Sequence, residues 1–288
     1  MKKLTVIIRS FQEKAGRVNR FNHEEFQLDV ATPIKKLITG KNIERIILIS
    51  NGDENNELSE QVDINNKTKT ILAAEEFFKD EIKSQKIICH TCKNWGLNPG
   101  SASALNEGAK IADELGAEWI LCWSTEFELN SARIESALSL LNDYNLKVVG
   151  FLRENWWEKT QWNVVQNTAA IWELKSLKDI NFFSERCNGT GEKIYIEELK
   201  TRVLVAGMED FHALLRMLKS SSSFRWGVSG KTNLSKWRHK FSDEERQKRS
   251  NIKISRQYEV MKLYVNEIFP NSEYHKVMNQ LFSLYHIS

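Results

Sequence analysis

Glycine, proline and serine are concentrated where an apolar run gives way to a helical pattern, between residues 94 and 109. Gly96, Pro99 and Gly100 let the chain turn sharply, and Ser101 can cap the helix that follows. Small residues allow a ligand to approach the helix start, where free N–H groups favour a diphosphate. A plain loop before a tightly packed helix explains the same residues, so spacing alone leaves both interpretations open.

Two groups of carboxylates lie where they could act on a ligand. Glu126 and Glu128 follow an apolar run, and their spacing puts both side chains on one face of an extended segment. Glu209 and Asp210 open an amphipathic helix. Surface acids at a strand end explain the first pair equally well, and acids in a first helical turn often only complement the helix dipole.

Aromatic residues and cysteines offer two further candidates. Trp156, Trp157 and Trp162 crowd one segment, where indole rings could stack on sugar rings or pack in the core. Cys89 and Cys92 have a C-x-x-C spacing without the second pair that a structural zinc site needs. Buried, reduced thiols are predicted, with metal or redox chemistry as the alternative.

Short apolar runs alternate with helical patterns through the first half of the chain, which predicts parallel strands joined by helical crossovers. Strands are expected at 5–8, 43–50, 87–91, 119–123 and 147–152. Helices are expected at 32–39, 68–83, 101–115 and 131–144. The strands are apolar almost throughout, so we expect an α/β fold with a mostly parallel sheet covered on both faces.

The second half is less regular. Residues 208–219 predict a helix with one apolar stripe, and 258–269 and 274–284 predict two more. We therefore expect one α/β domain over residues 1–220 and a helical, partly basic extension over 221–288 that packs on it.

Six residues form the pattern N-x-G-x-x-x-G-x-x-x-A-x-N-x-G, namely Asn94, Gly96, Gly100, Ala104, Asn106 and Gly108. This pattern resembles the segment after the third strand in family 2 glycosyltransferases of the GT-A fold. Segments 6–12, 47–53 and 207–210 resemble further landmarks of that family in the same order. The resemblance covers roughly residues 4–220 and implies a GT-A-like, Rossmann-like sheet.

The resemblance also implies roles for particular residues. Those expected to bind a nucleotide-sugar donor are Arg9, Ser10, Asp53, Asn94, Gly100, Asn106 and Ser124. In the family, the Asp of the pair matched by Glu209 and Asp210 removes the acceptor proton, so Asp210 is expected to be the base, with Glu209 positioning it or the acceptor. Trp156, Trp157 and Trp162 are expected to face the acceptor.

The family usually ends its fourth strand in Asp-x-Asp, which holds a divalent metal on the diphosphate. Here Ser124 and Glu126 replace the two Asp residues. Mg²⁺ keeps several waters and takes ligands from phosphates, so Glu126, with Glu128 as a second carboxylate and His239 as a C-terminal ligand, is the expected set for Mg²⁺ or Mn²⁺.

The sequence therefore predicts an enzyme that moves a sugar from a nucleotide-sugar donor to an acceptor hydroxyl, with inversion. The acceptor is a glycan, a lipid-linked molecule or a protein. One alternative is a non-catalytic nucleotide-sugar-binding relative, which the loss of Asp at Ser124 favours. Another is a nucleotidyltransferase, although the segment after the first strand holds only Gly16 between Lys14 and Arg17, where that class is Gly-rich.

Composition limits the class further. The 288 residues carry a net charge of only +3, which argues against a nucleic-acid partner. The first apolar run stops at Arg9, so no targeting segment is expected, and no stretch has the length of a membrane span. A cytoplasmic protein is expected, with the basic segment 237–249 offering a peripheral contact to the inner membrane surface.

Overall fold

A computed structural model gives the architecture of the chain. It describes residues 2–10, 21–52, 62–92, 102–125, 127–153, 169–178, 180, 182, 193–196, 201–204, 209–221, 223–232, 261–283 and 285–287.

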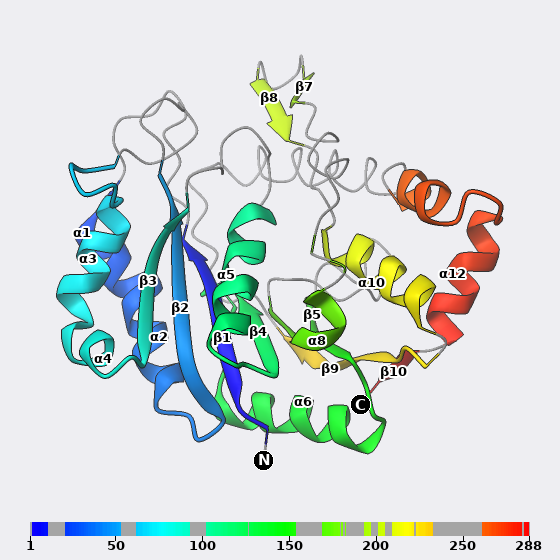
Figure 1. Cartoon of the computed structure of the whole chain (residues 1–288), viewed down its shortest axis with the longest axis horizontal. Helices are drawn as coiled ribbons and strands as arrows, with labels where there is room; N and C mark the ends of the chain where they lie inside the picture. The colour runs from blue at the N-terminus through cyan, green and yellow to red at the C-terminus, as the bar shows by residue number, and fades with distance from the viewer. Residues whose placement is uncertain are drawn as a thin grey trace.

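One eight-stranded sheet runs through the molecule in the order β10-β9-β5-β6-β4-β1-β2-β3 (Figure 1). Its strands are β1 (Leu4–Ser10), β2 (Ile43–Asn51), β3 (Ile87–Cys92), β4 (Trp119–Trp123), β5 (Val148–Arg153), β6 (Ala169–Glu173), β9 (Trp226–Thr232) and β10 (Tyr285–Ile287). Every pairing is parallel except those of β6, which runs antiparallel to both β4 and β5. A separate antiparallel pair is formed by β7 (Lys193–Ile196) and β8 (Thr201–Leu204).

Helices cover both faces of this sheet. One face packs against α5 (Ala102–Glu114), α8 (Leu174–Lys178), α10 (Glu209–Ser220), the helical residues 261–268, and α12 (Tyr274–Ser283). The other face packs against α1 (His23–Phe26), the π-helical turn η1 (Gln27–Ala31), α2 (Thr32–Ile38), α3 (Lys69–Phe77), α4 (Lys79–Lys83) and α6 (Ser131–Asp143). The predicted α/β fold, a mostly parallel sheet flanked by helices, is confirmed.

The apolar strands account for the two cores. In β1, Ile7 packs into the cluster with α5, whereas Val6 and Ile8 pack into the cluster on the opposite face, and all three are at most 1% exposed. Side chains of a strand alternate between faces, so only an uninterrupted apolar run can fill both cores.

Helix α5 lies very close to the first two strands because Gly108 has no side chain. A Cβ atom at this position would lie 2.6 Å from Ile7 Cγ2 and 2.9 Å from Ile49 Cδ1. The glycine therefore sets the distance between the helix and the sheet, which is a packing role for this member of the sequence pattern.

Three details differ from the sequence predictions. The helix expected at 68–83 is interrupted at Phe78, where the backbone leaves the helical conformation between α3 and α4. The Phe78 ring is fully buried. Strand β6 occupies a region for which no strand was expected. Strands β9 and β10 follow residue 220 and join the main sheet, so segments on both sides of the expected domain boundary contribute strands to it.

Candidate active site at the carboxyl edge of the sheet

The carboxyl ends of neighbouring parallel strands meet along one edge of the sheet. Ser10 of β1 pairs in register with Ser50 of β2, and Ser50 pairs with Thr91 of β3. On the other side, Ile8 of β1 pairs with Trp123, the last residue of β4. Open α/β sheets bind ligands beyond such an edge.

Several predicted site residues follow these strand ends in the chain. Asp53 comes shortly after the end of β2, Asn94 shortly after β3, and Ser124 directly after β4. Asp53, Asn94, Gly100, Glu126, Trp156, Trp157, Trp162 and His239 themselves lie outside the described residues.

The segment that contains Trp156, Trp157 and Trp162 connects β5 to β6, and both of its ends lie at the edge of the sheet where β4 ends. Strand β5 is parallel to β9 and antiparallel to β6, and Gly150 of β5 pairs with Ala170 near the start of β6. The chain therefore leaves the sheet after Arg153 and returns at Ala169 on the edge where β4 ends, since Ala169 pairs with Trp123. Strand β9 also ends on this side, at Thr232, seven positions before His239.

Two predicted donor-binding residues end β1. Ser10 is buried with 8% exposure, and Arg9 is half-buried. Ser50 on β2, which pairs with Ser10, is completely buried. Small hydroxyl side chains thus face each other where β1 ends, and a bulky apolar pair at these positions would extend the core instead.

The segment after β4 is a tight turn. The Phe127 N–H donates to the Ser124 carbonyl at 2.9 Å, and the Trp123 indole N–H donates to the Phe127 carbonyl at 2.8 Å. Ser124 is half-buried at the start of this turn, whereas the Glu128 side chain just beyond it is exposed. An oxygen-bearing turn is therefore anchored to the end of a fully buried strand.

The Asn106 side chain on α5 has a defined hydrogen-bond partner in the chain beyond α8. Its Oδ1 atom accepts a hydrogen bond from the Phe182 N–H at 2.9 Å, which links α5 to the chain beyond α8. This bond assigns Oδ1 as the acceptor and so fixes the orientation of the side-chain amide.

Asp210 lies in the first turn of α10, in agreement with the predicted helix. Its Oδ1 atom accepts a hydrogen bond from the Phe211 N–H at 2.8 Å, and the side chain is half-buried. The apolar stripe behind it, which includes Phe211, Leu214 and Leu215, is completely buried. In Figure 1, α10 starts near the centre of the molecule and runs outward toward α12, while β9 returns in the opposite direction.

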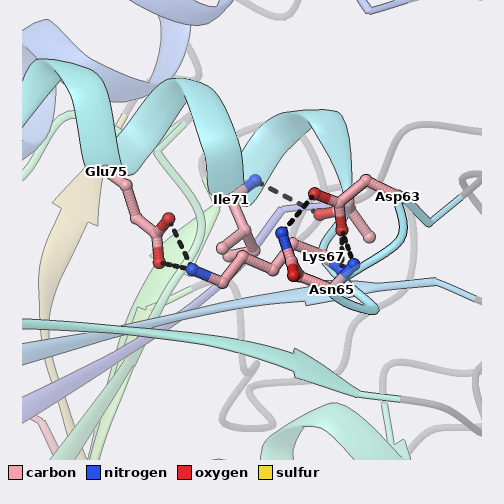
Figure 2. A network of polar contacts seen from close by, with 6 residues as sticks. Asp63, Asn65, Lys67, Ile71 and Glu75 are labelled. Atoms are coloured by element: carbon pink, nitrogen blue, oxygen red, sulfur yellow. Dashed lines mark hydrogen bonds and ion pairs between the residues drawn. The ribbon is translucent and has the colours of Figure 1, made fainter.

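A second ordered turn supports the end of β2 (Figure 2). The Asp63 carboxylate accepts hydrogen bonds from the backbone N–H groups of Asn65, at 3.0 Å, and Lys67, at 2.7 Å. The Lys67 ammonium donates to both oxygens of Glu75 on α3, each at 2.8 Å. This turn packs against Gly52, because a Cβ atom there would lie 2.4 Å from a Val62 methyl carbon.

The two cysteines of the C-x-x-C spacing are separated by the sheet. Cys92 belongs to the core cluster on the α5 face, whereas Cys89 packs against the opposite cluster. Neither forms a disulfide, and burial raises the pKa of the Cys89 thiol to about 12, with the Glu75 carboxylate adding to the effect. Because their side chains lie on opposite faces of the sheet, neither residue can pair with the other, and only Cys92 is buried as expected.

The described part of the chain contains no group of three or more His, Cys, Asp or Glu side chains that could hold a metal ion. The oxygen-bearing side chains that the structure describes directly after β4 include the Ser124 and Thr125 hydroxyls and the Glu128 carboxylate. Oxygen ligands suit a hard cation that takes its remaining ligands from water and phosphate. Within the same residues, no helix is long and apolar enough to cross a membrane.

Sequence reasoning missed one contributor to this edge. Trp123 was assigned only to a strand, although its indole N–H fixes the turn that carries Ser124. A Trp at the last position of a buried strand could have indicated this contact, because a buried indole N–H needs a hydrogen-bond acceptor nearby.

Comparison with known proteins gives structural matches only. No family model matches the chain, and neither does any curated protein. Among solved structures, it is similar to S. aureus TarS 1–349, with 13% identity, a TM-score of 0.46, and coverage of 98% of this chain and 72% of that one.

Two further TarS structures match the same 98% of the chain. The complex with UDP has 14% identity and a TM-score of 0.48, and the complex with UDP-GlcNAc has 15% identity and a TM-score of 0.47. They cover 70% and 73% of the TarS chain, respectively. Similarity at this level of identity concerns the fold alone.

Proposed function

We propose that this protein is a glycosyltransferase that transfers a sugar from a nucleotide-sugar donor to an acceptor hydroxyl, with inversion at the anomeric carbon. The observation that carries the proposal is the strand register. Because β1, β2, β3 and β4 end along one edge, the segments with the predicted donor-binding residues all leave the sheet there.

The donor would bind across these strand ends. Arg9, Ser10, Asp53, Asn94, Gly100, Asn106 and Ser124 are the proposed donor-binding residues. The proposed ligands of a Mg²⁺ or Mn²⁺ ion are Glu126, Glu128 and His239. Such an ion, when bound, neutralises charge on the departing diphosphate.

The transfer step needs a base for the acceptor hydroxyl. The acceptor oxygen bonds to the anomeric carbon as its proton passes to the Asp210 carboxylate. The bond between that carbon and the phosphate oxygen breaks, and the nucleoside diphosphate leaves with the bonding electrons. Glu209 would help to orient Asp210 or the acceptor, and Trp156, Trp157 and Trp162 would stack on the acceptor.

A panel of nucleotide sugars tests this proposal, with UDP-GlcNAc as the first probe. Purified protein with Mg²⁺ or Mn²⁺ is expected to release nucleoside diphosphate from at least one of them, and the product should have the opposite anomeric configuration by NMR. If no nucleotide sugar binds or is cleaved, the proposal is wrong.

A non-catalytic binding protein is the second candidate. Ser124 favours it, because a hydroxyl stands where the resemblance expects the first carboxylate. Donor binding without cleavage, with and without metal and candidate acceptors, would support this alternative.

A further inference from the structure

The turn after β4 is held by a side chain to which the proposed function assigns no role. Trp123 is only 2% exposed, and its indole N–H donates to the Phe127 carbonyl at 2.8 Å. The Phe127 N–H in turn donates to the Ser124 carbonyl at 2.9 Å. The two ends of the turn are therefore tied to each other and to the last residue of a buried strand.

The chain beyond the turn is also fixed. The completely buried Phe127 ring lies 5.8 Å from the Phe151 ring of β5, measured between centroids. The Glu128 carbonyl accepts a hydrogen bond from Arg133 Nη1 at 2.8 Å. Asn130 caps α6 by accepting a hydrogen bond from the Arg133 N–H at 3.0 Å.

These contacts hold Trp123, Ser124 and Phe127 together, and the Trp123 bond joins two buried residues. Without the indole N–H, the Phe127 carbonyl would lose its partner and the turn could relax. Ligands of a bound diphosphate and metal must hold their positions to within about 0.5 Å, so relaxation here would weaken binding.

We propose that Trp123 is a positioning residue, which acts through the Phe127 carbonyl to hold Ser124 in the position that binds the metal-complexed diphosphate of the donor. This inference rests on the proposed function. Trp123 does not touch the substrate in this account and acts only through the Phe127 carbonyl.

The chain offers a matched control for this bond. Trp226 is also completely buried, and its indole N–H donates to the Leu281 carbonyl at 2.9 Å. It lies at the first position of β9, where the strand starts, whereas Trp123 lies where β4 ends. Trp123→Phe and Trp226→Phe therefore remove the same kind of bond at opposite edges of the sheet.

The experiment is calorimetric titration with UDP, GDP, CDP and ADP, with and without Mg²⁺, on the wild type and both variants. With Mg²⁺, Trp123→Phe is expected to bind the preferred nucleotide about ten-fold more weakly than the wild type, since one net hydrogen bond is at stake. Binding without Mg²⁺ should change little. Trp226→Phe should lose thermal stability without this selective loss of binding.

The outcomes separate the two proposals. If the wild type binds none of the nucleotides, the proposed function fails and this inference fails with it. If the wild type binds and both variants bind equally well, Trp123 is structural only and this inference alone is overturned. Should Trp123→Phe not fold, benzothienylalanine at position 123 keeps the indole shape without the N–H, and the same comparison applies.

Discussion

Strands β1 to β4 pair with one another only in parallel, in the order β3-β2-β1-β4. Strands β5, β9 and β10 connect to them through β6, which is antiparallel to both β4 and β5. In the first region, strand ends next to one another in space carry the proposed donor-binding residues. In the second region, the chain supplies α10 with Asp210 and the attachment points of the Trp-rich segment. Under the proposed function, the first region would bind the nucleotide-sugar donor and the second region would activate the acceptor.

The largest expected effect tests this division at Asp210. Asp210→Asn keeps the shape of the side chain, and the amide oxygen can still accept the hydrogen bond from the Phe211 N–H. We expect transfer to fall by about 10²–10⁴-fold because the proton acceptor is lost, while donor affinity stays unchanged. Steady-state transfer rates and calorimetric donor titration measure the two properties separately.

Glu209→Gln is the companion variant, and it should lose less activity because the base remains. Transfer by Asp210→Asn within a few-fold of the wild type would remove Asp210 from the chemistry. A parallel loss of donor affinity would instead break the proposed division between the two regions.

A smaller effect concerns pH and is specific to the second region. His212 on α10 is 1% exposed and its ring packs edge-on against Tyr264, with centroids 5.0 Å apart. Burial, with a smaller contribution from the positive charge of Arg216, lowers the pKa of His212 to about 4. In the unfolded chain the pKa is about 6.5.

Between these two values the unfolded chain binds a proton that the folded protein excludes. Lowering the pH from about 6.5 toward 4 should therefore reduce the free energy of unfolding, by up to about 3 kcal/mol from this residue. Denaturant titrations of the wild type and His212→Phe at several pH values measure the effect. The two proteins should differ in pH dependence in this range, and identical slopes would contradict the prediction.

The smallest effect belongs to the first region and tests its packing. Gly108→Ala would place a methyl group against Ile7 Cγ2, which lies on a branched side chain within the buried strand β1. Overpacking costs about 1–3 kcal/mol, and the higher helix propensity of Ala offsets about 1 kcal/mol. We expect a net loss of about 1 kcal/mol in denaturant unfolding. Lys110→Ala, at an exposed position of the same helix, is the control, and a Gly108→Ala protein more stable than the wild type would show that α5 can move away.

The two regions also differ in how well the sequence predicts them. The sequence predicts strands β1 to β4 and helices α2 and α5 to within a few residues of their observed bounds, because each strand is an apolar run next to a clear helical pattern. It does not predict α1 and η1, and it predicts one helix where α3 and α4 are separate. Strand β6 is short, and both its pairings are antiparallel to neighbours that local patterns do not specify. Strand β9 contains Gly227 and Gly230, which favour a loop interpretation.

At the candidate site, residue types and strand ends were predictable, but individual contacts were not. The motif pattern includes Asn106, yet its bond to the Phe182 N–H joins residues 76 positions apart. The Trp123 indole reaches a carbonyl only four residues away, but that contact depends on the turn that it helps to form. Long-range bonds and turns fixed by side chains leave no periodic signal in a sequence.

The position of α12 and β10 in the fold has a consequence for biosynthesis. Leu281 is completely buried, its carbonyl accepts the Trp226 indole N–H, and Tyr285 of β10 pairs with Trp226. A ribosome adds these late residues after almost all of the other strands have left the exit tunnel. The first four strands can associate during translation, but the second region must wait with Trp226 exposed until the last helix emerges. A chaperone that shields apolar surface would therefore be needed most in that interval.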